Sequence, residues 1–397
     1  MTHTITARHL ITDIGTIEFP VLTITDGIIT DISSDPEALA HETDTLTAAF
    51  FDIHTHGAMG HDVMQVTPAE LGEVQRFLAH HGVAHYLPTT VTAPVDTILR
   101  SLEALANAIE SPTLENEATP VGIHLEGPFL SHAKRGVHPI ADLQPPSIEL
   151  FDRFHTAARG HIKLVTVAPE PHAAKPLSGP WALDTKPASA LDLITHATSQ
   201  GVRVSLGHSN ATAAQTLPAI AVGATSATHT YNAMRSMDHR EPGILGTVLT
   251  DDRLYAELIC DGVHVAPAMV RLWLRAKGLD RAILVTDAMS ATGMPPGPYT
   301  LAGQPVTVTN DRAVLTEAPE TLAGSILTMD AAVSHLQTFT AASLADATRL
   351  ATHNPAAMLG IPTLTRLAPG SPANLNRFNA ANQLTATYLR GVKLPKI

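Results

Sequence analysis

Several side chains that can bind a metal ion or carry a proton stand at the ends of apolar runs in the middle of the chain. Glu126 ends the run Gly-Ile-His-Leu-Glu and is followed at once by a Gly-Pro pair, which reverses the chain. His208, His229 and Asp287 end three later runs of the same kind. A carboxylate and two imidazoles form a ligand set that suits Zn²⁺ or Fe²⁺ and leaves a position open for water. We therefore expect Glu126, His208 and His229 to hold a divalent metal ion.

Two more histidines, His54 and His56, end the first apolar run with one residue between them. A spacing of two on a strand places both imidazoles on one side, as two ligands of one ion require. By itself this pattern also fits two packed or surface histidines, and the same holds for each single histidine downstream. The convergence of several strand ends with Glu126 favours a metal site.

Asp287 has the chemistry of a general base and acid. A carboxylate opposite a metal-activated water can take its proton and return it to a leaving group, a role commonly worth ~10²–10⁴ in rate. The metal itself would bring the pKa of bound water toward about 7 and polarise a carbonyl group. The alternative for Asp287 is a helix N-cap or a turn. The sequence contains no phosphate-binding Walker loop, dinucleotide glycine fingerprint or nucleophile elbow, so metal-assisted hydrolysis is the favoured chemistry.

The elements that must position these residues alternate between strands and helices from residue 48 onward. Such alternation indicates repeated βα units around a parallel sheet. Eight strands are predicted, at 49–54, 85–90, 121–126, 162–169, 202–208, 224–230, 255–262 and 282–288. Eight strands predict a (β/α)₈ TIM-like barrel over residues 48–360, whose active site would lie at the carboxyl ends of the strands.

The two ends of the chain predict a second, smaller unit. Residues 1–47 alternate short Thr-, Ile- and Val-rich runs with turns, and residues 361–397 return to strand-like runs. We expect both segments to form one small β-sandwich domain.

Helices are predicted at 67–81, which begins with a Thr-Pro-Ala-Glu capping pattern, and at 187–200, which precedes Gly201. Two more are predicted at 328–339 and 343–352. Residues 289–328 are rich in Gly and Pro and predict a long loop with one hairpin.

Composition excludes several classes of protein. The 397 residues are 44% hydrophobic, enough for a large core, and carry a net charge of −12 without a basic stripe. Nucleic acid and anionic membrane are therefore not expected as partners. Cys260 is the only cysteine, which excludes an internal disulfide and a Cys-rich zinc site. No apolar segment reaches the ~20 residues of a membrane span, and we expect a cytoplasmic protein.

A series of motifs, in order from about Asp52 to Gly360, resembles the N-acetylglucosamine-6-phosphate deacetylase family of the amidohydrolase superfamily. The motifs are His124-Leu-Glu-Gly-Pro-Phe, Lys134-Arg-Gly-Val-His, Leu206-Gly-His-Ser-Asn-Ala, Thr228-His-Thr-Tyr-Asn-Ala-Met, His239-Arg-Glu-Pro-Gly, Asp261-Gly-Val-His, Val285-Thr-Asp-Ala-Met and Thr321-Leu-Ala-Gly-Ser. The resemblance implies conversion of N-acetylglucosamine 6-phosphate and water to glucosamine 6-phosphate and acetate, in amino-sugar catabolism and cell-wall recycling.

The resemblance also implies residue roles. Glu126, His208 and His229 would ligate the catalytic metal, Zn or Fe, and Asp287 would be the general acid and base. His54 and His56 would allow a second ion, with Glu126 as the bridge in place of the carbamylated lysine of other relatives. Lys163, near the start of a strand, should point away. The substrate contacts would be Val137, His138, Asn232, Ala233, Arg240, Asp261, His264, Leu322, Ala323 and Gly324.

Arg240 is expected to reach the site of a neighbouring subunit, so the resemblance implies a homodimer. A guanidinium binds phosphate bidentately, and His264 adds a donor. The alternative for Arg240 is a surface ion pair with Glu241, worth little. The role of His132 and the number of ions, one or two per subunit, stay open at this point.

Two rival functions remain. Another amidohydrolase, acting on a cyclic amide or an unphosphorylated N-acyl compound, would share the metal site but would not need Arg240 and His264. A non-catalytic sugar-phosphate sensor would bind ligand without releasing acetate, and the presence of Asp287 argues against it.

Overall fold

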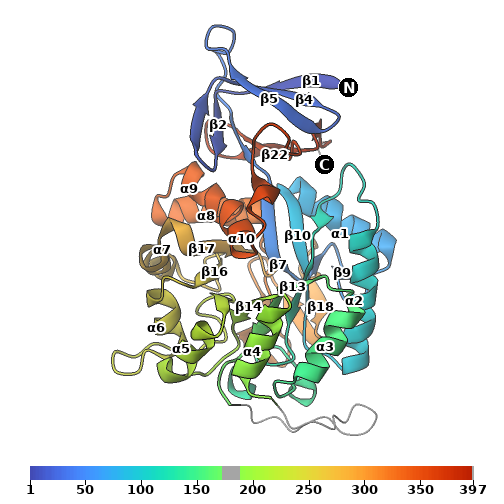
Figure 1. Ribbon diagram of the computed structural model, residues 1–397, viewed down its shortest axis with the longest axis vertical. Coiled ribbons are helices and arrows are strands. Elements are labelled where there is room, and N and C mark those ends of the chain that lie inside the picture. Colours follow the sequence, from blue (N-terminus) through green and yellow to red (C-terminus); the bar gives the residue numbers. More distant parts are fainter. Residues whose placement is uncertain (172–187, 396–397) are drawn as a thin grey trace.

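The computed structural model describes residues 1–171 and 188–395, which form a large barrel and, beside it, a smaller set of β-sheets. In Figure 1 the barrel with its helices lies below, and the sheets that contain both ends of the described chain lie above. β7 leads directly from the small sheets into the barrel.

Parallel strands form the barrel, paired in the order β7-β10-β12-β13-β14-β15-β16-β17. Their bounds are β7 Phe50–Thr55, β10 Val83–Thr90, β12 Ile123–Glu126, β13 Ile162–Val167, β14 Arg203–Leu206, β15 Ala224–Ala227, β16 Tyr255–Ile259 and β17 Ala282–Val285. The ring closes beyond the end of β17, where Thr55 and Ala288 form a parallel bridge and the Asp287 amide donates to the His54 carbonyl at 2.9 Å. The predicted (β/α)₈ barrel is confirmed.

Helices surround the barrel (Figure 1). They are α1 Pro68–His80, α2 Val95–Glu110, α3 Ile148–Ala157, α4 Ala190–Ser199, α5 Ala213–Ala221, α6 Gly243–Thr250, α7 Pro267–Arg281, α8 Met329–Thr340, α9 Leu344–Leu350 and α10 His353–Met358. Their apolar faces pack on the strands, and Trp273 of α7 and Phe154 of α3 are fully buried. Within the described residues no helix is long and apolar enough to cross a membrane.

The predicted helices near residues 67–81, 187–200, 328–339 and 343–352 correspond to α1, α4, α8 and α9. Thr67 caps α1 through a capping box with Glu70, as the sequence pattern indicates. Ser189 caps α4 in the same way, so this helix begins three residues after the predicted start at Pro187, which lies outside the described residues. Gly201 follows with φ +78°, a backbone conformation that suits glycine.

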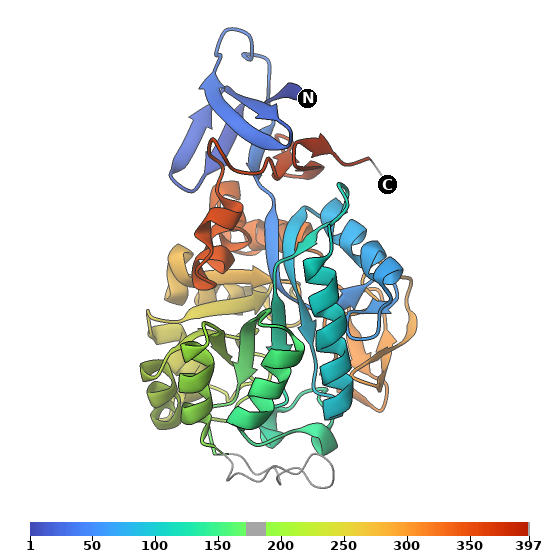
Figure 2. The same ribbon diagram turned by 45° about the vertical axis from the view of Figure 1, so that its right-hand side comes forward.

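The small unit is a pair of sheets built from both chain ends (Figure 2). One sheet has the order β1-β4-β5 and the other β24-β23-β22-β6-β2-β3. Their bounds are β1 Thr2–Thr6, β2 His9–Thr12, β3 Gly15–Glu18, β4 Pro20–Thr25, β5 Ile28–Ser34, β6 Thr45–Ala48, β22 Leu375–Phe378, β23 Leu384–Leu389 and β24 Val392–Lys393. β22 pairs with β6, and Leu10, Leu22, Ile24 and Leu375 share a core separate from that of the barrel. The predicted β-sandwich is confirmed.

The segment that follows the last barrel strand differs from the prediction. Residues 289–328 contain a four-stranded antiparallel sheet, not one hairpin, made of β18 Gly297–Leu301, β19 Gln304–Val308, β20 Ala313–Leu315 and β21 Ala318–Leu322. The turn between β18 and β19 places Ala302 and Gly303 at positive φ, and an alanine is an unusual residue for such a turn. The Gly- and Pro-rich start of the segment also conceals β18 in the sequence.

Candidate functional site

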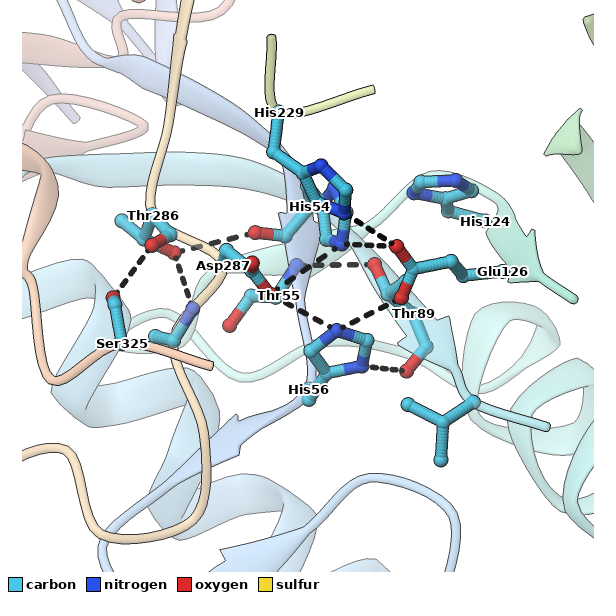
Figure 3. Close-up of polar contacts among 12 residues, drawn as sticks. His54, Thr55, His56, Thr89, His124, Glu126, His229, Thr286, Asp287 and Ser325 are labelled. Atoms are coloured by element: carbon cyan, nitrogen blue, oxygen red, sulfur yellow. Dashed lines mark hydrogen bonds and ion pairs between the residues drawn. The ribbon is translucent and has the colours of Figure 1, made fainter. Parts of the chain in front are cut away.

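Two groups of three buried side chains meet at the carboxyl ends of the barrel strands. One group is Glu126, His208 and His229, and the other is His54, His56 and Asp287. Figure 3 shows Glu126 of β12 facing His54 and His56 of β7 and its continuation, with His229 and Asp287 on the other sides. Each group has the size and the donor types of a metal site.

His208, His229 and Asp287 each lie two residues beyond the end of their strand, not within it as predicted. β14, β15 and β17 end at Leu206, Ala227 and Val285. The three residues have φ values of +46°, +27° and +51°, in the left-handed region. This conformation turns the chain away from the strand direction and is costly for a residue with a Cβ. Its recurrence at three candidate ligands indicates that the site geometry requires it.

Donor spacing in the first group fits a cation. The Nε2 atoms of His208 and His229 lie 3.0 Å apart, and they lie 3.2 and 3.1 Å from Oε1 of Glu126. A tetrahedral ion with bonds of about 2.1 Å places neighbouring ligand atoms roughly 3.4 Å apart. All three donor atoms therefore point at one small space of the right size for a metal ion.

The second group lies on the other side of Glu126. His56 Nε2 is 3.3 Å from Glu126 Oε2 and 3.1 Å from Asp287 Oδ1. His54 Nε2 is 3.5 Å from both Glu126 Oε1 and Asp287 Oδ1, and it is a buried nitrogen with no hydrogen-bond partner. A buried polar atom without a partner is costly, and a cation between these groups would satisfy the Nε2 nitrogen through its lone pair.

Outer contacts fix the orientation of three imidazoles. His56 Nδ1 is 2.9 Å from the Thr89 carbonyl, and His208 Nδ1 is 3.0 Å from the Lys134 carbonyl. His54 Nδ1 is 3.2 Å from Oε2 of Glu257. Because these oxygens accept hydrogen bonds, each Nδ1 carries a proton, and each Nε2 is the nitrogen that would offer its lone pair to a cation.

The electrostatics of the site call for positive charge. Burial opposes a charged His56, but the Asp287 and Glu126 carboxylates outweigh it and raise the pKa of His56 to about 9. Against the same opposing effect of burial, Glu126 and Asp287 raise the pKa of His54 well above its ordinary value. Burial also opposes a charged Asp287, yet the surrounding imidazoles lower the pKa of its carboxyl. A divalent cation would supply the charge that protons supply otherwise.

Two buried side chains that the sequence analysis did not single out support the site. Asp52 Oδ2 accepts a hydrogen bond from the Thr286 hydroxyl at 2.5 Å, and Asp52 Oδ1 accepts one from the His54 amide at 3.3 Å. It thus ties the ends of β7 and β17 together. Burial raises the pKa of Asp52 to about 6 despite these bonds. The sequence signal for Asp52 and Glu257 was available: each is a single charged residue within an apolar strand.

A cavity of about 350 Å³ opens over the two groups. Its lining includes seven of the ten predicted substrate contacts: Val137, His138, Asn232, Ala233, His264, Leu322 and Gly324. Asp261 lies behind His264 and holds it, with Oδ2 at 2.6 Å from Nδ1. Ala323 is fully buried behind the wall. Lys134 and Glu320 also line the cavity, although no role was predicted for either.

Arg240 does not line the cavity of its own chain. It is exposed, and its backbone amide donates to Asp238 at 2.9 Å. A contact between Arg240 and this cavity therefore needs a second subunit or a movement of the loop. His132 also lies outside the lining. Lys163 is exposed, as its place near the start of β13 predicts.

The closed barrel, with its imidazoles and carboxylates at the carboxyl end, defines a metal-dependent hydrolase. A model of the amidohydrolase family matches residues 45–393. The chain belongs to this family, within its group of N-acetylglucosamine-6-phosphate deacetylases.

Several relatives cover most of the chain. N-acetylgalactosamine-6-phosphate deacetylase of Escherichia coli O157:H7 is 36% identical over 98% of this chain and 99% of the relative. N-acetylglucosamine-6-phosphate deacetylase of Bacillus subtilis is 36% identical over 85% of this chain and 83% of the relative. A similar solved structure is a variant of the Mycobacterium smegmatis N-acetyl-D-glucosamine-6-phosphate deacetylase with N-acetyl-D-glucosamine 6-phosphate. Its TM-score is 0.88 at 32% identity, with 99% of both chains covered.

Proposed function

We propose that the protein hydrolyses the acetamido group of N-acetyl-D-glucosamine 6-phosphate to D-glucosamine 6-phosphate and acetate, in amino-sugar catabolism. The observation that carries the proposal is the cavity in which candidate metal ligands, Asp287, His138 and His264 face one space. Its volume of about 350 Å³ lies at the lower end of the ~300–1,000 Å³ usual for small-molecule sites. The names of two relatives describe deacetylases of N-acetylated amino-sugar phosphates, which are substrates of this class.

We assign Glu126, His208 and His229 to one ion and His54, His56 and Asp287 to a second, with Glu126 between them. Mixed nitrogen and oxygen donors suit Zn²⁺ or Fe²⁺. Four buried carboxylates surround the site, namely Asp52, Glu126, Asp287 and Glu257. Two divalent cations would balance their four charges, which supports two ions over one. Bound there, a cation lowers the pKa of water and polarises the substrate carbonyl.

Asp287 moves the proton in this proposal. Its carboxyl is ionised at neutral pH, because the imidazoles around it lower its pKa despite its burial. It can therefore take a proton from the attacking water and return it to the departing amine.

His138 is proposed to bind the acetamido carbonyl oxygen. Its Nδ1 accepts the Thr92 amide at 3.2 Å, so its proton is on Nε2. Burial, with the nearby His208, holds its pKa well below the ordinary value and keeps the ring neutral. Nε2 lies 3.7 Å from Glu126 Oε2, at the metal groups. The Nε2 hydrogen can thus stabilise negative charge as it develops on the carbonyl oxygen.

The 6-phosphate is proposed to bind His264, held by Asp261, and the backbone of Asn232 and Ala233. Arg240 of a neighbouring subunit would complete this site in a homodimer, and a guanidinium matches two phosphate oxygens at once. We also propose a cytoplasmic location, because a phosphorylated sugar carries charge that does not cross a lipid bilayer unaided.

Acetate release tests the proposal. The purified protein is assayed with N-acetylglucosamine 6-phosphate, with its C4 epimer N-acetylgalactosamine 6-phosphate, with unphosphorylated N-acetylglucosamine and with a cyclic amide. We expect kcat/KM for a phosphorylated substrate to exceed that for the unphosphorylated sugar by at least about 100-fold, since the phosphate contacts would go unused. The epimer is included because one relative, whose similarity extends over 98% of this chain, is named as an N-acetylgalactosamine-6-phosphate deacetylase. Cyclic-amide hydrolysis, or binding without acetate release, would contradict the proposal.

A further inference from the structure

Glu257 is a carboxylate buried in the barrel interior. It stands in the middle of β16, between Ala256 and Leu258, and is 0% exposed. Its Oε2 atom lies 3.2 Å from His54 Nδ1 and accepts the His229 amide at 3.3 Å. Its Oε1 atom is buried without a partner. A buried carboxylate is costly unless a positive group compensates it, so its presence here calls for a reason.

Its two contacts join the two groups of candidate ligands. His54 belongs to the group with His56 and Asp287, and His229 belongs to the group with Glu126. The contact to His229 is to the backbone, whereas the contact to His54 is to the ring itself. Glu257 therefore acts most directly on the orientation and the tautomer of His54.

The ring of His54 needs this acceptor because carboxylates also face its other nitrogen. Nε2 lies 3.5 Å from both Glu126 Oε1 and Asp287 Oδ1, and either could accept a proton from it. If the proton moved to Nε2, no lone pair would be left for a cation. An acceptor at Nδ1 holds the proton on the side of the ring away from the metal groups.

We propose that Glu257 is a positioning residue that fixes the Nδ1–H tautomer of His54 and thereby enables the His54, His56 and Asp287 group to bind a metal ion. The inference rests on the metal ligation proposed above. His56 and His208 obtain the same support from backbone carbonyls of Thr89 and Lys134. Of these three supports, only that of His54 is a side chain, so substitution can remove it.

The test is cation binding by the full-length chain after removal of metal with a chelator. Co²⁺ is titrated calorimetrically, and bound metal is counted by mass spectrometry. The variants are Glu257→Leu, which removes the acceptor, and Glu257→Gln, which keeps an amide oxygen without the charge. His54→Ala serves as the reference for loss of this group. Glu117→Gln is the matched control, since Glu117 is a buried carboxylate that pairs with Arg76 away from the site.

Wild type and Glu117→Gln should bind two cations. In Glu257→Leu the cation at His54, His56 and Asp287 should lose about 10–100-fold in affinity, as is usual when an outer partner of a ligand histidine is removed. The affinity of Glu257→Gln for this cation should lie between those of wild type and Glu257→Leu. His54→Ala should lose the same cation, while every variant keeps the other one. The thermal unfolding of each metal-free variant checks that the barrel is folded.

A folded Glu257→Leu protein that binds both cations as tightly as wild type would overturn the proposal. Equal weakening of both cations would also overturn it, because Glu257 would then act on the site as a whole. If wild type binds only one cation and His54→Ala binds it equally well, there is no second ion, and the proposed role of Glu257 is wrong. Wild type with two cations but no acetate release contradicts the proposed reaction and leaves the role of Glu257 in place.

Discussion

Glu126 is the residue on which both groups of candidate ligands depend. Its Oε1 atom faces His208, His229 and His54, while Oε2 faces His56. Because Oε1 also lies 3.5 Å from His54 of the second group, the carboxylate as a whole lies between the two groups, where it would be able to contact an ion in either. The family resemblance of the sequence predicts Glu126 as a ligand and as a bridge, and in the structure its carboxylate lies within 3.5 Å of rings from both groups.

Asp287→Asn separates metal binding at Glu126, His208 and His229 from proton transfer. The amide keeps the size of the side chain but cannot take a proton from water. We expect kcat for acetate release to fall ~10²–10⁴-fold, with little change in KM. Metal analysis of the same preparation should show that the ion at Glu126, His208 and His229 is retained. Asp330→Asn, at a carboxylate paired with His81 away from the cavity, is the control and should be fully active. Turnover near the wild-type rate would remove Asp287 from the mechanism.

At the scale of elements, the short turns after the strands place the side chains. Gly57 follows His56 directly and has φ +149°. A Cβ atom added to Gly57 would overlap the carbonyl oxygen of His61, because the chain folds back on itself through β8 Gly57–Ala58 and β9 His61–Asp62. The turn that carries His56 therefore requires glycine.

Gly57→Ala should destabilise this turn. Gly15→Ala is the matched control, since Gly15 has φ +142° but no atom within 4 Å of an added Cβ. We expect Gly57→Ala to lower the free energy of unfolding by roughly 1–3 kcal/mol more than Gly15→Ala. Urea unfolding of the metal-free proteins measures this difference. If both variants lose the same free energy of unfolding, the turn accommodates the added Cβ atom and crowding against His61 has no effect.

At the scale of the whole molecule, the proposed homodimer can be tested with mixed subunits. Arg240→Ala and Asp287→Asn chains, each expected to have little activity alone, are unfolded together and refolded. If Arg240 acts in the neighbouring site, a mixed dimer holds one intact site, because the subunit with Asp287 receives Arg240 from its partner. Random pairing should then restore roughly a quarter of the wild-type activity. No recovery in mixtures that form dimers would place Arg240 outside the neighbouring site.

The junction between the barrel and the terminal sheets gives a pH prediction. Burial, together with Arg390, lowers the pKa of His85 from 6.5 to about 4, and Asn374 lies 3.2 Å from its Nε2 atom. Between these pH values the unfolded chain binds a proton at His85 that the folded chain does not. The free energy of unfolding should therefore fall with falling pH in this window, by at most about 1.4 kcal/mol per unit.

Asn374→Asp should reduce this loss. A carboxylate beside His85 favours the imidazolium, raises the pKa of His85 in the folded chain and lets both states bind the proton. Urea unfolding at pH 7 and pH 5 should show a smaller difference for the variant than for wild type. Parallel behaviour of the two proteins would show that His85 does not set the acid sensitivity of this junction.

The sequence by itself determined the elements of the barrel, their order and the candidate site residues, but not the four-stranded sheet after β17. Alternating apolar runs and amphipathic segments indicate a barrel, because each period matches one type of element and its buried face. The capping pattern at Thr67 defines the start of α1 within one residue. Glu126, His208, His229, His54, His56 and Asp287 were recognisable because polar residues at strand ends are unusual in a buried sheet.

Tertiary structure alone decided which of these side chains face the same space. His229 and Glu126 are 103 residues apart in sequence yet 3.1 Å apart in space, since closure of the barrel brings them together. The left-handed turns at His208, His229 and Asp287 and the contact of Glu257 with the His54 ring have no local signal, although Glu257 itself stands out as a charged residue in an apolar strand. Each depends on contacts between distant strands, and local propensity does not encode such contacts.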